Sequence, residues 1–127
     1  MTIKAGDTFL LDCGLSYPRH LHIALTDSEG DPPCALLVPI NSLKDCSDST
    51  VILRAADRAH PFIVEDSAVS YEIMESMYVD EVFDRDMNTG PQIQIAQKYL
   101  PIIQQGALLS ERTVNGMRKA IKRRLSL

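Results

Sequence analysis

Three histidines are the residues of this sequence best suited to proton transfer near neutral pH. His20 and His22 are two residues apart in the extended segment His20–Thr26, so their side chains project to the same side of a strand. An imidazole with an ordinary pKa of about 6.5 can act as a base or an acid there. His60 precedes the segment Pro61–Val64, which can bring it towards that face from a neighbouring loop. His20 and His60 are therefore candidate catalytic residues. The alternative is that His20 and His22 line a solvated strand face and His60 hydrogen-bonds a turn.

The elements that would hold these histidines are short strands. Leu21, Ile23 and Leu25 alternate with polar residues, which is the period of a half-buried strand. Asp27–Pro33 is rich in turn-forming residues and predicts a hairpin loop that returns through an apolar strand. Pro39 in that strand lacks an N–H group, so we expect an edge or a bulge there. The predicted strands are Thr8–Asp12, His20–Thr26, Cys34–Ile40, Thr50–Leu53, Pro61–Val64 and Ser67–Met74.

A turn-rich joint, Asp84–Pro91, separates these strands from a helical part of the chain. Gln92–Gln105 has apolar residues at helical spacing, but Pro101 interrupts them, so two short helical pieces are expected. Gly106 suits a helix C-cap, and Ser110 suits the N-cap of a last helix. The apolar stripe of that last helix consists of Val114, Met117, Ile121 and Leu125.

Short strands at close spacing with helices appended are typical of a small barrel or sandwich. The sequence therefore predicts a single domain over residues 1–127, mainly β with C-terminal helices, which is an α+β class. Residues 1–83 form its strand-rich body, in which the segment 75–83 either extends the last predicted strand or bends into a further one. Residues 91–127 form the helices.

The composition is that of an ordinary globular protein, with 127 residues of which 45% are hydrophobic and 24% charged. Apolar runs such as Ala35–Ile40 are much shorter than the roughly 20 residues that cross a bilayer, and the N-terminus lacks the apolar run of a secretory signal. We therefore expect no membrane span. Cys13, Cys34 and Cys46 are irregularly spaced, which predicts neither a disulfide framework nor a metal site, and a reducing cytoplasm is the expected location. Without a phosphate-binding or dinucleotide motif, no cofactor is expected.

Charge is distributed unevenly along the chain. Residues 1–110 contain 16 acidic and 7 basic residues, which gives a net charge of −9. Residues 111–127 contain 6 basic residues and one acidic residue, which gives +5. An acidic body disfavours non-specific binding of nucleic acid, whereas the basic end of the chain could approach phosphate or simply form a solvated helix face.

The order of several short motifs resembles the MazF/PemK family, the toxins of bacterial toxin–antitoxin pairs. Gly6-Asp7 opens the first strand, and the returning strand ends in Val38-Pro39-Ile40-Asn41-Ser42. A later strand starts at Asp66-Ser67-Ala68-Val69, and His60–Tyr71 resembles a divergent branch of the family. The resemblance covers about the first 80 residues. It implies an SH3-like barrel with C-terminal helices that forms a homodimer, binds an antitoxin protein and cleaves single-stranded RNA without metal.

The same resemblance assigns roles to particular residues. Family members commonly carry an arginine at the start of the second strand and a threonine or serine after the third. Here the second strand begins with Arg19-His20, so either Arg19 is the family arginine shifted by one residue or His20 replaces it, and Ser42 stands in for the hydroxyl residue. Arg19 would then stabilise the phosphorane, and Ser42 would position the substrate. His20 and His60 would then be the base and acid that act on the 2′-OH and the leaving 5′-oxygen.

Two further residues would bind the substrate. Asn41 precedes the serine of the third strand, and Tyr17 is in a loop next to Arg19, where its ring can stack on a base. Tyr71 is a weaker stacking candidate, because it shares the apolar face of its strand.

Two other functions remain open at this stage. The first is a catalytically inactive or repurposed barrel that binds a protein partner, such as a topoisomerase, because one fold can carry several functions. The second is a nucleic-acid binder that uses the basic residues from Arg118 to Arg124.

Overall fold

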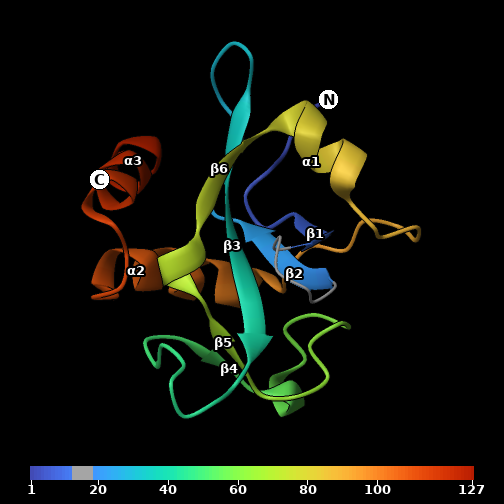
Figure 1. Cartoon of the computed structure of the whole chain (residues 1–127), viewed down its shortest axis with the longest axis vertical. Helices are drawn as coiled ribbons and strands as arrows, with labels where there is room; N and C mark the ends of the chain where they lie inside the picture. Colours follow the sequence, from blue (N-terminus) through green and yellow to red (C-terminus); the bar gives the residue numbers. More distant parts are fainter. Residues whose placement is uncertain (13–18) are drawn as a thin grey trace.

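The computed structural model describes residues 1–12 and 19–127. In these residues the chain is a small α+β protein with a six-stranded antiparallel sheet and three α-helices (Figure 1). The strands are β1 (Thr8–Asp12), β2 (Arg19–Ala24), β3 (Cys34–Ser42), β4 (Ile52–Leu53), β5 (Ser67–Val69) and β6 (Glu75–Tyr78). The helices are α1 (Val79–Arg85), α2 (Leu100–Leu109) and α3 (Asn115–Arg124), with short 3-10 turns η1 (Ala55–Asp57), η2 (Tyr71–Ile73) and η3 (Gln97–Tyr99).

Strand β3 is shared by both halves of the sheet. The strand order is β1-β2-β3-β5-β4, and β6 also pairs with β3. Cys34–Leu37 pairs with β6, whereas the pairing with β5 begins at Ile40. Pro39 lies between these two stretches, at the point where β3 changes its partner. The missing N–H group is tolerated there, which agrees with the expected irregularity at this proline.

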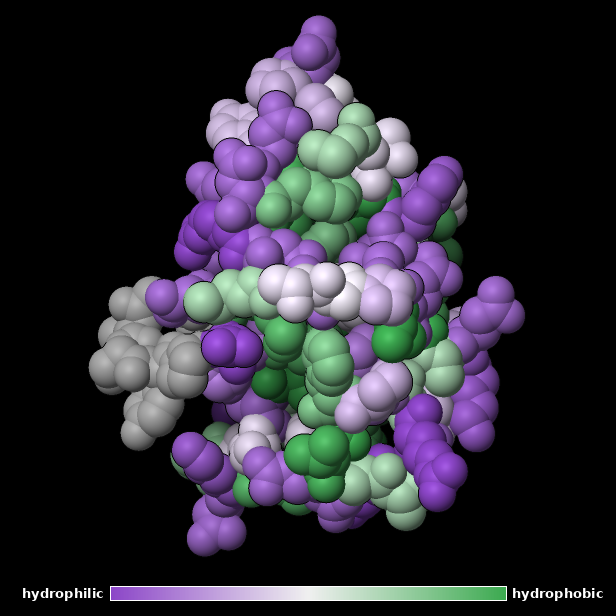
Figure 2. Space-filling model, turned by 90° about the vertical axis from the view of Figure 1, so that its right-hand side faces the viewer, coloured by the Kyte–Doolittle hydropathy of each residue, from purple (hydrophilic) through white to green (hydrophobic). Residues whose placement is uncertain are grey.

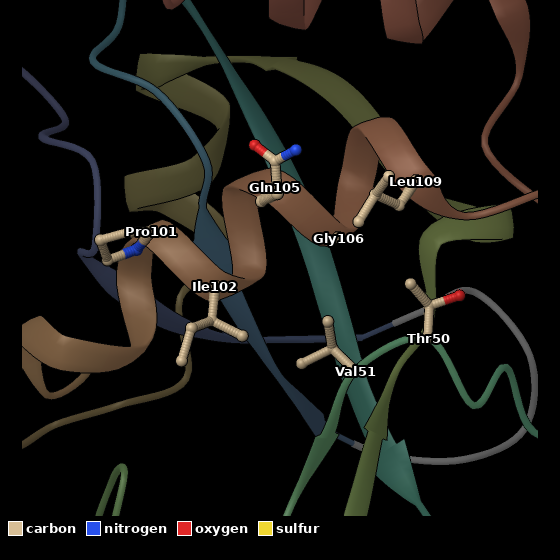
Figure 3. Close-up of a pocket in the computed structure, with 7 residues that line it drawn as sticks. All are labelled: Thr50, Val51, Pro101, Ile102, Gln105, Gly106 and Leu109. Carbon is tan, nitrogen blue, oxygen red and sulfur yellow. The ribbon is translucent and has the colours of Figure 1, made fainter.

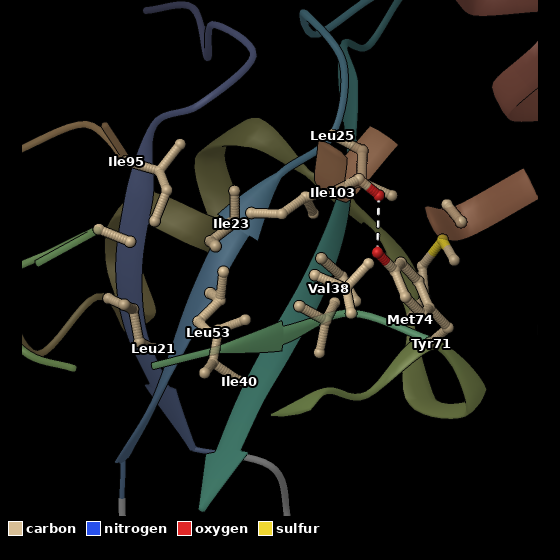
Figure 4. Packing of buried hydrophobic residues seen from close by; sticks show 14 of the residues in the cluster. Leu21, Ile23, Leu25, Val38, Ile40, Leu53, Tyr71, Met74, Ile95 and Ile103 are labelled. Atoms are coloured by element: carbon tan, nitrogen blue, oxygen red, sulfur yellow. Dashed lines mark hydrogen bonds between the residues drawn. The ribbon is translucent and has the colours of Figure 1, made fainter. Parts of the chain in front are cut away.

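Both faces of the sheet are buried. On one face, residues of β2 and β3 pack with Tyr71, Ile103 of α2 and Ile121 of α3 (Figure 4). On the opposite face, a second apolar cluster packs against α1. The prediction of a half-buried β2 is therefore wrong, because α1 covers its second face and His22 is only 2% exposed. The second cluster consists of Ile3, Phe9, Leu11, Ala24, Ala35, Leu37, Met77, Val79 and Val82.

Three predicted elements differ in the structure. Pro61–Val64 forms a turn instead of a strand. The predicted strand Ser67–Met74 ends at Val69, because η2 interrupts it before β6 begins. The helix α1 replaces the end of the predicted strand region, and Val79 and Val82 form its buried side. Figure 2 shows the side of the molecule that carries α1, where hydrophobic atoms are exposed between hydrophilic ones.

In the helical part of the chain, the two helical segments expected before Gly106 are present, but the expected helix caps at Gly106 and Ser110 are not. The two expected pieces are η3 and α2, and Pro101 lies in the first turn of α2, where a proline is tolerated. Ser110 follows the end of α2 instead of capping α3, which begins at Asn115. In the expected stripe, Ile121 is buried and Val114 is exposed. Within the described residues, no helix is both long and apolar enough to span a bilayer.

Gly106 is not a C-cap, because it lies inside α2 at its closest approach to the sheet. A Cβ atom added there would collide with the Tyr71 hydroxyl group and with Cγ2 of Val51. Tyr71 cannot move away easily, since it is buried and its hydroxyl donates a hydrogen bond of 2.7 Å to the Ile103 carbonyl. The small residue at this position therefore sets how closely α2 packs on the sheet.

We expect Gly106→Ala to lower the free energy of unfolding by about 1–3 kcal/mol, because overpacking outweighs the better helix propensity of alanine. Gly116→Ala in α3 is the matched control, since nothing lies within 4 Å of its added Cβ. That variant should be stabilised by up to about 1 kcal/mol. Urea denaturation of both variants measures the difference, and equal stabilities would contradict this packing.

Candidate functional site

The ends of three strands bring most of the predicted site residues to one end of the sheet. β2 begins with Arg19 and His20, and β3 ends with Asn41 and Ser42. The register pairs Arg19 with Asp12, the last residue of β1, so all three strand ends meet here. Tyr17, the predicted stacking residue, lies outside the described residues. Of the candidates that the structure describes, all but His60 lie at this end of the sheet.

These strand-end residues divide between the two faces of the sheet. The β2–β3 register pairs His22 with Pro39, and continuing it by two residues sets His20 opposite Asn41. The same continuation sets Arg19 opposite Ser42. Because side chains alternate along a strand, His20 and Asn41 share one face while Arg19 and Ser42 share the other.

The polar groups at the end of β3 already have partners. The Asn41 Nδ2 atom donates to the Ser70 hydroxyl at 2.6 Å. The Ser42 hydroxyl donates to the Glu65 carboxylate, which adds a negative charge at the end of β3. Arg54 and Asp66 form an ion pair of 3.0 Å. This pair lies near the end of β3, because the Asp66 carbonyl oxygen accepts a hydrogen bond from the N–H group of Leu43. This end of the sheet therefore carries mixed charge and not a cationic surface.

His60 is a buried connector between β1 and the segment before α2. Its Nε2 atom lies 3.0 Å from the Ile93 carbonyl oxygen and 3.0 Å from the Thr8 hydroxyl. Its Nδ1 atom accepts a hydrogen bond of 3.1 Å from the Phe62 N–H group. Because a carbonyl only accepts and an amide N–H only donates, these contacts fix the neutral ring with its proton on Nε2. Burial lowers the pKa of His60, which keeps the ring neutral.

The structure does not bring His20 and His60 together. Thr8, which contacts His60, pairs with Ile23 and lies on the face that packs against α2. His20 pairs with Leu11 and lies on the opposite face, which packs against α1. The sheet therefore separates the two imidazoles that the sequence suggested as base and acid.

His22 is buried on the same face as His20. Its Nδ1 atom is 2.8 Å from the His20 carbonyl oxygen, and its pKa is lowered, chiefly because burial disfavours the charged ring. The interior position is consistent with a packing role for His22 and a hydrogen-bonding role for His60.

The two buried histidines predict a loss of stability in mild acid. Their pKa values are lowered in the folded state, so on acidification the unfolded chain binds protons first. The free energy of unfolding should therefore decrease as the pH falls below about 6.5, the ordinary histidine pKa. Urea denaturation between about pH 7.5 and 5 measures the slope.

His60→Gln should reduce this slope, because it removes one of the two buried imidazoles. His20→Gln is the matched control, since it leaves both buried rings in place and should change the slope less than His60→Gln does. If His60→Gln left the slope unchanged, the burial of a neutral ring would be contradicted.

The basic residues near the C-terminus are largely occupied within the molecule. Arg118 donates to the carbonyl oxygens of Leu108 at 3.3 Å and Ser110 at 2.7 Å, which satisfies the free carbonyl end of α2. Arg123 and Arg124 contact the Glu29 carboxylate at 2.8 and 3.1 Å. The expected basic face is therefore mainly a set of contacts that hold α3 to α2 and to the β2–β3 hairpin.

An apolar groove runs along α2, away from the predicted site (Figure 3). It has a volume of about 470 Å³, and Ile102 and Leu109 point from α2 towards Val51 and Thr50. Ile102 is 50% exposed and Leu109 66% exposed. The lining residues are Thr50, Val51, Pro101, Ile102, Gln105, Gly106 and Leu109.

The sequence contained a signal for this groove that the residue-by-residue interpretation missed. The helix sequence Leu-Pro-Ile-Ile-Gln-Gln-Gly-Ala-Leu-Leu is apolar on nearly all sides. A helix of that kind is normally buried all round, so one that packs on a single sheet leaves an apolar face uncovered.

Comparison with the models of known protein families gives no match, and comparison with curated proteins gives none either. Among the described residues, no group of three or more histidine, cysteine, aspartate or glutamate side chains is placed to hold a metal ion.

Proposed function

We propose that this chain is a MazF/PemK-like barrel that acts by binding a protein partner. The order of its strands and motifs supports the likeness, and the separation of His20 from His60 weighs against the proton relay of a nuclease. A single observation carries the binding role: α2 exposes Ile102 and Leu109 beside an apolar groove.

Exposed apolar surface of this kind is costly in water and commonly marks an interface. A partner that inserts apolar side chains between Ile102 and Val51 would remove this surface from water. The groove floor is closely packed, because not even a Cβ atom fits at Gly106 between Tyr71 and Val51. The side chains of the floor would therefore lose little conformational entropy when a partner binds, which favours affinity.

In the toxin–antitoxin setting that the motifs imply, the partner is a cognate antitoxin in the cytoplasm. The homodimer implied by the same likeness is the other occupant, and sedimentation of the isolated chain over a range of concentrations distinguishes the two. A monomer that becomes a heteromeric complex with the product of an adjacent gene supports the antitoxin.

Ile102→Asp should weaken this complex at least about tenfold, because it places a charge in the apolar centre of the interface. Ile73→Asp is the matched control, since Ile73 has a similar exposure but does not line the groove. Isothermal titration of the co-expressed partner measures both affinities. Equal binding by the two variants and the wild type would exclude the α2 groove.

A second candidate function is metal-independent cleavage of single-stranded RNA. The observation that favours it is the gathering of Arg19, His20, Asn41 and Ser42 at one end of the sheet. There His20 would take the proton of the 2′-OH, and water would protonate the leaving 5′-oxygen. Arg19, which begins the strand on the other face, would stabilise the phosphorane from around the strand end, and His60 would not contribute.

This candidate predicts that purified protein cleaves single-stranded RNA in the presence of a chelator. His20→Ala should then lower the rate by about 10²–10⁴-fold, whereas His60→Ala should lower it only in proportion to the unfolded fraction. Sequencing of the 5′ ends measures cleavage. RNA that stays intact with the wild-type protein would exclude this function and leave the binding proposal standing.

A further inference from the structure

A second hollow, separate from the α2 groove, lies between the β2–β3 hairpin and α1. Its volume is about 530 Å³. The lining residues are Pro32, Tyr78, Asp80, Glu81, Asp84 and Arg85.

Hydrogen bonds hold both walls of this hollow. The Val79 N–H group at the start of α1 donates to the Pro33 carbonyl oxygen of the hairpin at 3.0 Å. At the other end of α1, Arg85 Nη2 donates to the Asp12 carbonyl oxygen of β1 at 3.3 Å. The hollow is therefore a fixed feature of the fold and not a gap between independent segments.

Tyr78 supplies an exposed aromatic ring at the junction of β6 and α1. It is 55% exposed, although the neighbouring Met77 and Val79 are buried. Together with Pro32 it gives the hollow an apolar floor. An aromatic face of this kind attracts a guanidinium or ammonium group as well as apolar side chains.

The rim of the hollow is negatively charged. Three carboxylates and one guanidinium line it, which leaves a net charge of −2. Glu81 forms a long ion pair of 3.7 Å with Arg85. The side-chain carboxylates of Asp80 and Asp84 form no hydrogen bond or ion pair within the part of the chain that the structure describes. The two carboxylates therefore remain available to a cation from outside the molecule.

We propose that this hollow docks a basic, extended segment of another protein. An arginine or lysine of that segment lies over the Tyr78 ring and between Asp80 and Asp84, and a neighbouring apolar side chain packs on Pro32. Nucleic acid fits poorly, because its phosphates would meet three carboxylates within a body that carries −9. Charge complementarity thus selects a cationic peptide.

A pair of short fluorescein-labelled peptides tests this proposal by fluorescence anisotropy. One alternates arginine with leucine, and the other has glutamate in place of arginine. The full chain should bind the arginine peptide and not the glutamate peptide, with an affinity that falls as salt rises because charge pairs at a rim are screened. Tyr78→Ala should weaken binding about tenfold or more, and Tyr78→Phe should retain it.

Charge-neutral variants locate the interaction. Asp80→Asn with Asp84→Asn should weaken binding about fivefold, since two exposed ion pairs are lost. Asp57→Asn, which removes an exposed carboxylate of η1 outside the hollow, is the matched control and should bind as the wild type. Circular dichroism of each variant confirms that it is folded.

Two outcomes would overturn the proposal. The first is equal binding of the arginine and glutamate peptides, which would show that charge does not select the ligand. The second is an equal loss of affinity in Asp57→Asn and in the double variant, which would show diffuse attraction to an acidic body. Both outcomes leave the α2 groove untouched, since none of the altered residues lines it.

Discussion

The pairing of β3 on both of its edges is the interaction on which the rest of this structure depends. Its residues pair with β2 on one side and with β6 and then β5 on the other. The change of partner at Pro39 lets one strand belong to two halves of the sheet. Because β6 leads directly into α1 and β5 leads into η2, this strand also decides where the covering elements lie.

The covering elements in turn decide what the polar residues can do. Because α1 covers one face and α2 the other, His22 in the middle of β2 is an interior group, whereas His20 nearer the strand end is only partly buried. His22 and His60 are both buried, and their lowered pKa values follow from that burial. The exposed features of the described residues include an apolar groove on α2 and an acidic hollow beside α1. These two surfaces are the basis on which we propose protein binding.

Local sequence patterns predicted those strands, turns and helix breaks whose formation depends on residues close together in the chain. The alternation around Ile23 located β2, and the turn residues between Asp27 and Pro33 located the hairpin. The break at Pro101 separated η3 from α2, because a proline acts on its own backbone. The α+β class follows from these local features, and so does the interior position of Tyr71.

The features that the sequence did not predict depend mainly on contacts between residues far apart in the chain. Ser110 is a residue type that often caps helices, yet its hydroxyl donates a hydrogen bond of 2.5 Å to the carboxylate of Asp48, 62 residues away in the sequence. Gly106 resembles a C-cap until Tyr71 is placed against it. Val79–Arg85 is too short for its period to distinguish a helix from a strand, so the cover on the second face was missed. The separation of His20 from His60 follows from that missing layer and from strand register.

His60 is a neutral, hydrogen-bonded part of the interior and lies across the sheet from His20. Nitrogen-15 NMR of the imidazole rings as a function of pH tests it most directly. The structure predicts that His60 keeps its proton on Nε2 and stays neutral below its ordinary pKa for as long as the protein is folded. Titration of His60 at about 6.5 in the intact fold, the ordinary value for an exposed imidazole, would contradict this account.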